Sequence, residues 1–160
     1  MPRLSAGILL HRRAGEDVEV LIAHMGGPFW AKKDEGGWSI PKGEYDEDET
    51  PIAAARREFA EELGAPAPDG EYLDLGRARV TSGKYLTVFA VEADFDADAI
   101  SPGTFDMEWP PRSGRTESFP EVDRAAWFDR ATAAAKLVKG QVVFLERLWE
   151  RLAQPPTTSP

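Results

Sequence analysis

The chain of 160 residues contains no cysteine and only two histidines. Without cysteine it can form no disulfide, no thiol nucleophile and no cysteine-ligated zinc or iron–sulfur site. His11 and His24 show no metal-ligand spacing, and no Ser/His/Asp arrangement accompanies them. We therefore expect both histidines to be structural residues at strand ends rather than catalytic bases.

The sequence also lacks an apolar run long enough to cross a membrane. Its first residues, MPRLSAGILLHRR, do not have the architecture of a signal peptide, so we expect a cytoplasmic protein with no membrane partner. The formal net charge of -9 argues against nucleic-acid polymers and anionic membranes as partners. A small phosphorylated substrate stays compatible with that charge, because a bound metal ion can neutralise it locally.

Hydrophobic residues, in contrast, make up 42% of the chain, and charged residues make up 29%. These values and the length are those of one globular domain with a single proper core. The most informative stretch of that domain runs from Gly43 to Ala65. Within it, Thr50 is suited to cap a helix, Pro51 to begin it and Gly64 to end it. Apolar residues follow at the 3, 4, 4 spacing of a core-facing stripe: Ile52, Ala55, Phe59 and Leu63.

The same helix carries three glutamates on another face. Glu58, Glu61 and Glu62 stand at i, i+3 and i+4, so their side chains lie close together and repel one another. A helix that needed only solubility would disperse these charges. A divalent cation between them explains the arrangement, because hard cations such as Mg²⁺ prefer oxygen ligands.

The stretch as a whole resembles the Nudix box, G-x5-E-x7-R-E-U-x-E-E-x-G-U, in which U is a bulky aliphatic residue. Gly43 is followed after five residues by Glu49, and after seven more by Arg57-Glu58-Phe59-Ala60-Glu61-Glu62-Leu63-Gly64-Ala65. Two positions depart from the pattern, since Phe59 is aromatic and Ala65 is small. Neither is a metal-binding position in the family.

The resemblance implies the Nudix fold, an α+β architecture in which a mixed β-sheet is sandwiched between helices. It implies a single domain over residues 1–153, after which we expect a disordered tail over 154–160. The cofactor it implies is Mg²⁺, for which Mn²⁺ can substitute. The implied metal ligands are the Gly43 carbonyl, Glu58, Glu61 and Glu62, and Arg57 would hold the carboxylates in place, Glu49 among them.

The remaining chain predicts strands over residues 4–12, 18–23, 71–80 and 84–93, a helical turn over 131–136 and a helix over 141–152. Residues 120–129 resemble the segment that precedes and forms a late strand in Nudix proteins. Residues 94–119 show no sustained periodicity, and we expect an irregular excursion near the site. In Nudix relatives a carboxylate just before the late strand contacts metal or acts as general base. Of the candidates Glu117, Glu121 and Asp123, we favour Glu121, so the predicted catalytic set is Arg57, Glu58, Glu61, Glu62 and Glu121.

Several residues outside the box are candidates for substrate contact. Lys42 offers a point charge to a phosphate, or is simply a surface lysine. Arg79, Lys84 and Tyr85 lie on predicted strands and are either substrate contacts or exposed sheet residues. The loop over 26–37 and the segment with Trp109, Arg112 and Arg115 could bind a base or phosphates, or could be packed aromatics with solvated charges.

The lead-in to the box, W-x-x-P-K-G from Trp38 to Gly43, resembles that of Nudix enzymes acting on dinucleoside polyphosphates or related polyphosphorylated substrates. The resemblance therefore implies a Mg²⁺-dependent nucleotide pyrophosphohydrolase that cleaves a phosphoanhydride in a nucleoside diphosphate-linked substrate. A dinucleoside polyphosphate or a nucleoside triphosphate is the favoured substrate. The alternatives are a housecleaning pyrophosphatase for oxidised nucleotides and a non-catalytic nucleotide-binding module. The partner is a small nucleotide, and the protein is a monomer or a homodimer.

Overall fold

A computed structural model describes residues 2–154 of the chain. The tail expected over 154–160 lies, apart from Gln154, outside the described residues. Three α-helices and nine β-strands follow one another in the order β1 (Arg3–Ala14), β2 (Asp17–Met25), β3 (Trp38–Ser39), β4 (Lys42–Tyr45), α1 (Pro51–Leu63), β5 (Leu73–Thr81), β6 (Lys84–Glu92), β7 (Thr104–Glu108), β8 (Thr116–Pro120), β9 (Val122–Asp129), α2 (Arg130–Lys136) and α3 (Val142–Ala153). Two short 3₁₀ turns lie at Ala97–Ala99 and Lys139–Gln141.

The seven-stranded mixed sheet is built around β1, its central strand. Along one edge β1 pairs in parallel with β6, and β5 follows antiparallel to β6. On the other edge β1 changes partner, because residues 4–7 pair with β4 and residues 11–14 pair with β2. The sheet therefore splays between β2 and β4, and that opening is where the candidate site lies.

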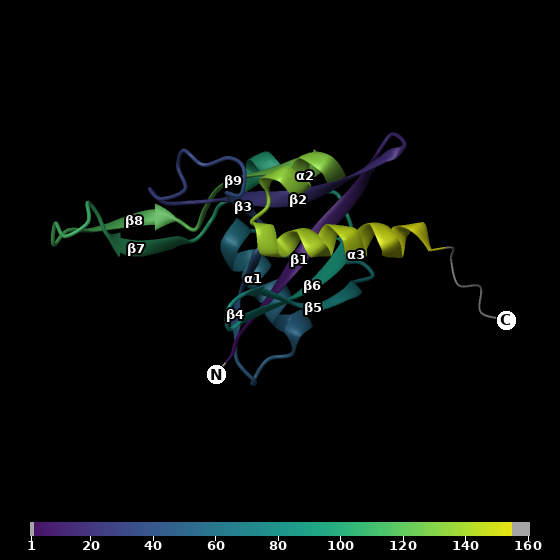
Figure 1. The fold of residues 1–160 in the computed structure, drawn as a ribbon, viewed down its shortest axis with the longest axis horizontal. Helices are drawn as coiled ribbons and strands as arrows, with labels where there is room; N and C mark the ends of the chain where they lie inside the picture. Colours follow the sequence, from purple (N-terminus) through teal and green to yellow (C-terminus); the bar gives the residue numbers. More distant parts are fainter. Residues whose placement is uncertain (1, 155–160) are drawn as a thin grey trace.

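Successive side chains along each strand point to opposite sides of the sheet, and both sides are buried. Ile8 and Leu10 of β1 pack with Phe59 of α1, whereas Leu9 packs on the opposite face with Phe144 of α3. The result is a mixed sheet flanked by helices, with α1 on one face and α2 and α3 on the other (Figure 1). The predicted α+β sandwich is confirmed. None of the helices within residues 2–154 is long and apolar enough to cross a bilayer.

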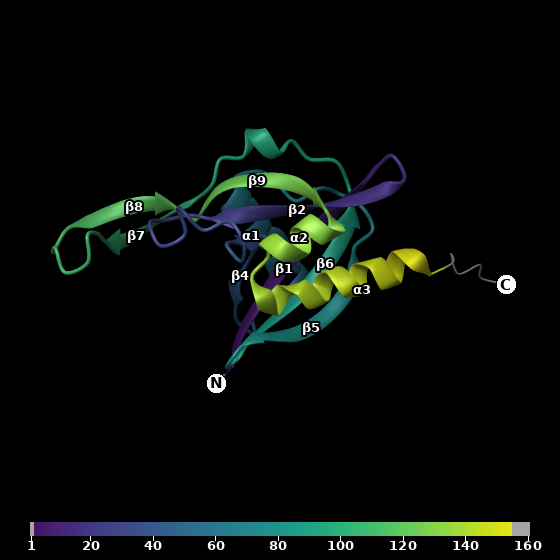
Figure 2. The same cartoon turned by 45° about the horizontal axis from the view of Figure 1, so that its top comes forward.

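Most predicted elements are confirmed, including helix α1 with both of its predicted ends. The prediction that residues 94–119 are irregular was wrong, since they contain the β7–β8 hairpin, which projects from the body of the domain (Figure 2). Phe105 and Met107 alternate with polar residues, but a five-residue alternation is too short to separate strand from loop. The late strand that residues 120–129 were expected to precede and form is β9, which begins at Val122, two residues after Pro120 ends β8.

Candidate active site

Helix α1 holds the box glutamates in fixed directions. The Thr50 hydroxyl accepts a hydrogen bond from the backbone N–H of Ala53 at 3.3 Å, which caps the first turn. At the other end Gly64 adopts φ 74°, a left-handed conformation in which its N–H donates to the Ala60 carbonyl at 2.8 Å. Phe59 is fully buried against the sheet, so the helix cannot rotate about its axis. The glutamates on its other face are therefore presented rigidly.

Arg57 ties three acidic side chains together. Its Nε and Nη2 donate to the two carboxylate oxygens of Glu49 at 2.8 and 2.7 Å, a bidentate pair. Its Nη1 donates to Glu58 at 2.7 Å and reaches Glu61 at 3.2 Å. The hydrogen bond from Arg57 holds the pKa of Glu49 below its usual range, and Glu49 in turn raises the pKa of the guanidinium. Both groups of that pair are ionised at neutral pH.

Glu58 packs directly onto the backbone of Gly43 in β4. A Cβ at position 43 would overlap the Glu58 carboxyl group and would lie only 2.6 Å from its Cγ. Glu58 can keep this position only with glycine at residue 43, because its carboxylate fills the space that a Cβ needs. The first and the later residues of the box are thus in contact across two elements.

Glu58 and Glu62 line a cleft of ≈ 330 Å³ together with Glu121, which follows β8. The other lining residues are Met25, Ser39, Lys42, Gly43, Glu44 and Val122. Burial raises the pKa of Glu62 to about 8; the charge of Lys42 opposes that rise, and Glu121 and Glu58 add to it. Burial also raises the pKa of Glu121, as do the charges of Glu58 and Glu61. The cleft thus holds several carboxylates and too few positive side chains to balance their charge.

This donor set suits a hard divalent cation. It consists of oxygen atoms only, and it includes a buried carboxylate whose ionised form needs a positive partner. Within residues 2–154 the structure gathers no group of three His, Asp or Glu side chains tightly enough to hold an ion. The glutamates line the cleft around a shared space rather than converging on one point.

The substrate-contact candidates separate into two groups. Lys42 and Lys84 line one cavity of ≈ 160 Å³ that also borders Gly43, Glu44 and Ser5. Arg79 and Tyr85 pair across β5 and β6, and Tyr85 alternates with Leu86 and Val88, whose side chains pack towards α3. Arg79 and Tyr85 therefore lie on the α1 face of the sheet. They line neither this cavity nor the cleft that contains Glu58 and Glu62.

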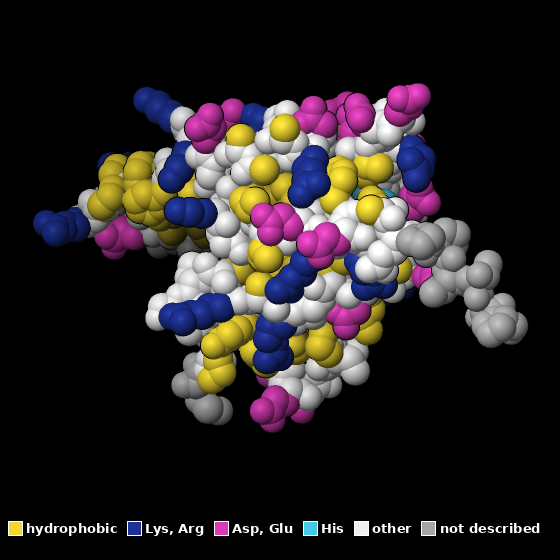
Figure 3. All heavy atoms as spheres, turned by 45° about the vertical axis from the view of Figure 1, so that its right-hand side comes forward, with side chains coloured by type: hydrophobic (Ala, Val, Ile, Leu, Met, Phe, Trp, Pro, Cys, Tyr) yellow, Lys and Arg dark blue, Asp and Glu magenta, His cyan; other side chains and the backbone are white. Residues whose placement is uncertain are grey.

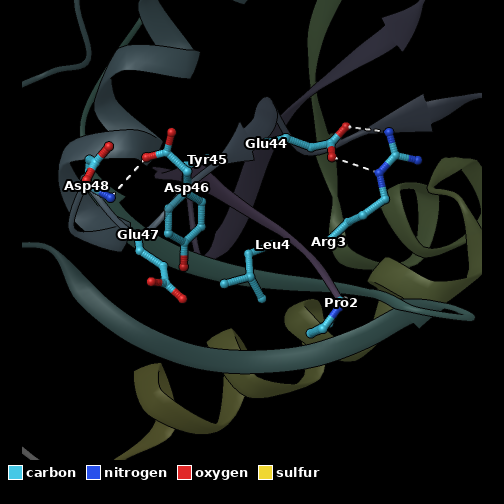
Figure 4. Close-up of a pocket in the computed structure, with 8 residues that line it drawn as sticks. All are labelled: Pro2, Arg3, Leu4, Glu44, Tyr45, Asp46, Glu47 and Asp48. Carbon is cyan, nitrogen blue, oxygen red and sulfur yellow. Dashed lines mark hydrogen bonds and ion pairs between the residues drawn. The ribbon is translucent and has the colours of Figure 1, made fainter.

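A larger hollow of ≈ 560 Å³ lies beside the N-terminal strand and contains the first residues of the box loop. In Figure 4 Arg3 faces Glu44, with hydrogen bonds of 2.9 and 3.2 Å, while Asp46, Glu47 and Asp48 lie at the opposite end. None of the α1 glutamates lines this hollow. It is therefore an outer surface of the box loop rather than the centre of the site.

One structural feature of the site could not be read from the sequence. His24 is fully buried, and its Nδ1 lies 2.9 Å from Asp123, two residues after Glu121. Its Nε2 lies 2.5 Å from the carbonyl oxygen of Lys33 in the loop over 26–37. His24 therefore joins that loop to the segment that carries Glu121. The only available signal was that His24 ends a buried strand, which is how its structural role was predicted.

Comparisons with known proteins agree with this geometry. The NUDIX domain family model matches residues 1–148. Among solved structures, the chain resembles the NUDIX domain of Shewanella oneidensis NrtR complexed with ADP ribose, at 17% identity and TM-score 0.61, covering 96% of this chain and 90% of that one. It resembles a C. elegans Ap4A hydrolase at 17% identity and TM-score 0.58, covering 94% and 98%.

It also resembles RenU, a Nudix hydrolase from M. smegmatis, at 25% identity and TM-score 0.55, covering 98% of this chain and 89% of that one. No curated protein sequence matches the chain. The family match spans nearly all of the domain, and Gly43, Glu58 and Glu62 of the box line one cleft, with Arg57 hydrogen-bonded to Glu58. The chain therefore belongs to the NUDIX domain family, the family of nucleotide pyrophosphohydrolases that its box predicted.

Proposed function

We propose that this protein is a Mg²⁺-dependent hydrolase that cleaves a phosphoanhydride bond in a nucleoside diphosphate-linked substrate. The observation that carries the proposal is one cleft lined by Glu58 and Glu62 from α1, by Glu121 from the segment after β8, and by Lys42. A phosphoanhydride resists attack through its own negative charge. Catalysis therefore needs positive charge and a positioned water in one place.

The residues that would hold the cation are Glu58, Glu61, Glu62 and the Gly43 carbonyl. Bound there, a divalent cation would neutralise phosphate charge and make an attacking water more acidic. Arg57 keeps Glu58 and Glu61 on the same side of the helix through its hydrogen bonds to both. Glu58 also packs against the Gly43 backbone, because its carboxylate occupies the space that a Cβ at position 43 would fill.

Lys42 and Lys84 are the phosphate-binding side chains in this proposal, since both border the cavity next to Gly43. The proton of the attacking water goes to Glu121 or to one of the box glutamates. Glu121 is suited to that role because it lines the same cleft as Glu58 and Glu62 without belonging to their helix. Arg79 and Tyr85 line neither the cleft nor this cavity, and the proposal gives them no role.

The favoured substrate is a dinucleoside polyphosphate or a nucleoside triphosphate. The W-x-x-P-K-G lead-in supports it, and so does the similarity in fold to a C. elegans Ap4A hydrolase. A role restricted to binding is disfavoured, because all three α1 glutamates and the arginine that holds them are present.

The test is the substitution Glu62→Gln, which keeps the shape of a buried side chain and removes its charge. We expect turnover of nucleotides to fall by about 100-fold or more, with circular dichroism and the melting temperature unchanged. The matched control is Glu150→Gln on the exposed side of α3, which should retain full activity. Wild-type turnover by Glu62→Gln would refute the assignment of this cleft as the metal site.

A further inference from the structure

The two histidines of the chain are both buried, but they differ in their hydrogen-bond partners. His24 is 0% exposed and His11 is 5% exposed, and Figure 3 shows almost no histidine on the face that it draws. Among residues 2–154, His11 Nε2 has no hydrogen-bond partner. In His24, Nδ1 lies 2.9 and 3.0 Å from the two carboxylate oxygens of Asp123, and Nε2 lies 2.5 Å from the Lys33 carbonyl oxygen. His24 is thus bound at both of its ring nitrogens, which packing alone does not require.

Both groups that His24 faces are hydrogen-bond acceptors. A neutral imidazole donates from only one ring nitrogen, whereas an imidazolium donates from both. The ring that satisfies the carboxylate and the carbonyl together is therefore the imidazolium, with Asp123 as its counter-ion. Arg124 also approaches Asp123, but at 3.7 Å and with a side chain that is 55% exposed, so water and salt screen its attraction. The hydrogen bond from His24 is the shorter and the more buried of the two contacts.

A β-bulge turns Asp123 towards His24. In the β2–β9 pair His24 lies opposite Arg124 and Met25 lies opposite Val122, so Asp123 is an extra residue on β9. Without the extra residue, Asp123 would alternate with Arg124 and point to the other face of the sheet. Bulges re-aim side chains in this way and are frequent beside active sites. The contact between His24 and Asp123 therefore stabilises the bulged register.

The bulge lies two residues from Glu121, whose backbone is held at both of its polar groups. The Glu121 N–H donates to the Gly103 carbonyl at 2.8 Å, and the Glu121 carbonyl accepts from the Gly26 N–H at 3.0 Å. Gly26 lies two residues after His24, and a Cβ on it would lie 1.9 Å from the Pro120 carbonyl oxygen. The end of β2 and the Glu121 segment are thus in direct contact. His24 does not line the cleft itself, so it can act on the cleft only through its neighbours.

We propose that His24 is a positioning residue for Glu121. The imidazolium holds Asp123 in the bulge, and the bulge determines where β9 begins and where the Glu121 carboxylate enters the cleft. The same ring holds the Lys33 carbonyl, so the loop over 26–37 and the Glu121 segment are fixed relative to each other. This inference rests on the proposed function, in which Glu121 is suited to take the proton of the attacking water. It gives His24 no contact with substrate or metal.

The first experiment compares His24→Phe with His11→Phe, the same substitution at the other buried histidine. Phenylalanine keeps a ring of similar volume and removes both N–H donors. For His24→Phe we expect kcat to fall about 10–100-fold, as when an outer partner of a site residue is lost, with KM nearly unchanged. His11→Phe, whose Nε2 has no hydrogen bond to lose, should retain the wild-type kcat.

Variants of Asp123 carry the same test should His24→Phe fail to fold, because the Asp123 side chain is 32% exposed. Asp123→Ala removes the acceptor from the bulge and should show the kcat loss expected for His24→Phe. Asp123→Asn keeps an acceptor oxygen for the ring and should recover part of that loss. A wild-type kcat in both His24→Phe and Asp123→Ala would overturn the inference.

The Glu121→Gln background separates positioning from a general loss of structure. Glu121→Gln should retain a residual rate, since a general base contributes about 10²–10⁴-fold. Because His24 acts through Glu121, adding His24→Phe should lower this residual kcat no further. Losses that multiply in the double variant would overturn the inference.

Amide hydrogen exchange gives a readout without turnover. His24→Phe should speed exchange at the Glu121 and Gly26 N–H groups by about tenfold or more, the effect of losing a hydrogen bond to a charged group, while the amides of α1 keep their protection. Wild-type protection at both groups would overturn the inference. Faster exchange in the variant, together with a wild type that cleaves no nucleotide, would refute the hydrolase and leave the hold of His24 on the Glu121 segment standing.

Discussion

Replacing Gly43 by alanine tests the contact on which the site is built. The new Cβ would overlap the Glu58 carboxyl group and lie 2.6 Å from its Cγ, well inside van der Waals contact. The clash is with the end of a side chain and not with backbone, so Glu58 rotates outwards while the fold remains. That rotation breaks the 2.7 Å hydrogen bond from Arg57 and moves a carboxylate that is 14% exposed into water.

The cost in unfolding free energy should be at most about 2 kcal/mol, the value of one hydrogen bond to a charged group. The loss of function should show in metal affinity, because displacing a ligand or its support typically lowers that affinity by about 10–100-fold. We therefore expect Gly43→Ala to need far more Mg²⁺ for half-maximal activity, with a loss of stability no larger than that of one hydrogen bond.

The control for Gly43→Ala is Gly15→Ala in the β1–β2 turn. Gly15 has φ 67° and no atom near its Cβ position, so alanine there strains only the backbone, by about 1–2 kcal/mol. Gly15→Ala should lose a similar amount of stability and keep its Mg²⁺ dependence, so the raised Mg²⁺ requirement alone distinguishes Gly43→Ala. A Gly43→Ala variant with wild-type activity at every Mg²⁺ concentration would refute the reasoning about Glu58.

Three further predictions concern Arg57, a buried histidine and the hydrophobic core. Arg57→Lys cannot reproduce the bidentate pair with Glu49, so kcat/KM should fall about 10–100-fold in steady-state assays with little change in melting temperature. Burial lowers the pKa of His11, so the folded state binds its proton less readily than the unfolded state does. Stability should therefore be complete above the unfolded pKa of about 6.5 and decrease as pH falls below it; urea titrations should show a smaller decrease for His11→Leu. Phe144→Ala, at a fully buried position of α3, should lower the unfolding free energy by about 3–5 kcal/mol.

The sequence was most informative where the chemistry is local. Helix α1, its caps and its glutamates lie within one stretch, and their spacing alone determines which side chains share a face. Glu121 could be proposed only by resemblance, because 59 residues separate it from Glu62 and nothing in the spacing joins them. The structure brings both to one cleft through the return of the β7–β8 hairpin.

Strand residues were harder to assign because their direction depends on register. Arg79, Lys84 and Tyr85 were predicted as one group, yet Lys84 and Tyr85 are neighbours in β6 and so point to opposite faces. The β5 register also shifts between Asp74 and Arg77, which changes the face of every later residue in that strand. Neither the direction of these side chains nor the register shift can be derived from composition or periodicity. The link from His24 to Asp123 spans 99 residues and has no sequence signal at all.

The most direct test of the account is product analysis after incubation of the protein with Mg²⁺ and a nucleotide panel. The panel holds diadenosine tetraphosphate, ordinary and oxidised nucleoside triphosphates, and nucleotide sugars, with products separated by anion-exchange chromatography. The account predicts Mg²⁺-dependent cleavage of a phosphoanhydride, with diadenosine tetraphosphate consumed most efficiently and Glu62→Gln inactive. Binding of these nucleotides without cleavage of any of them would contradict it.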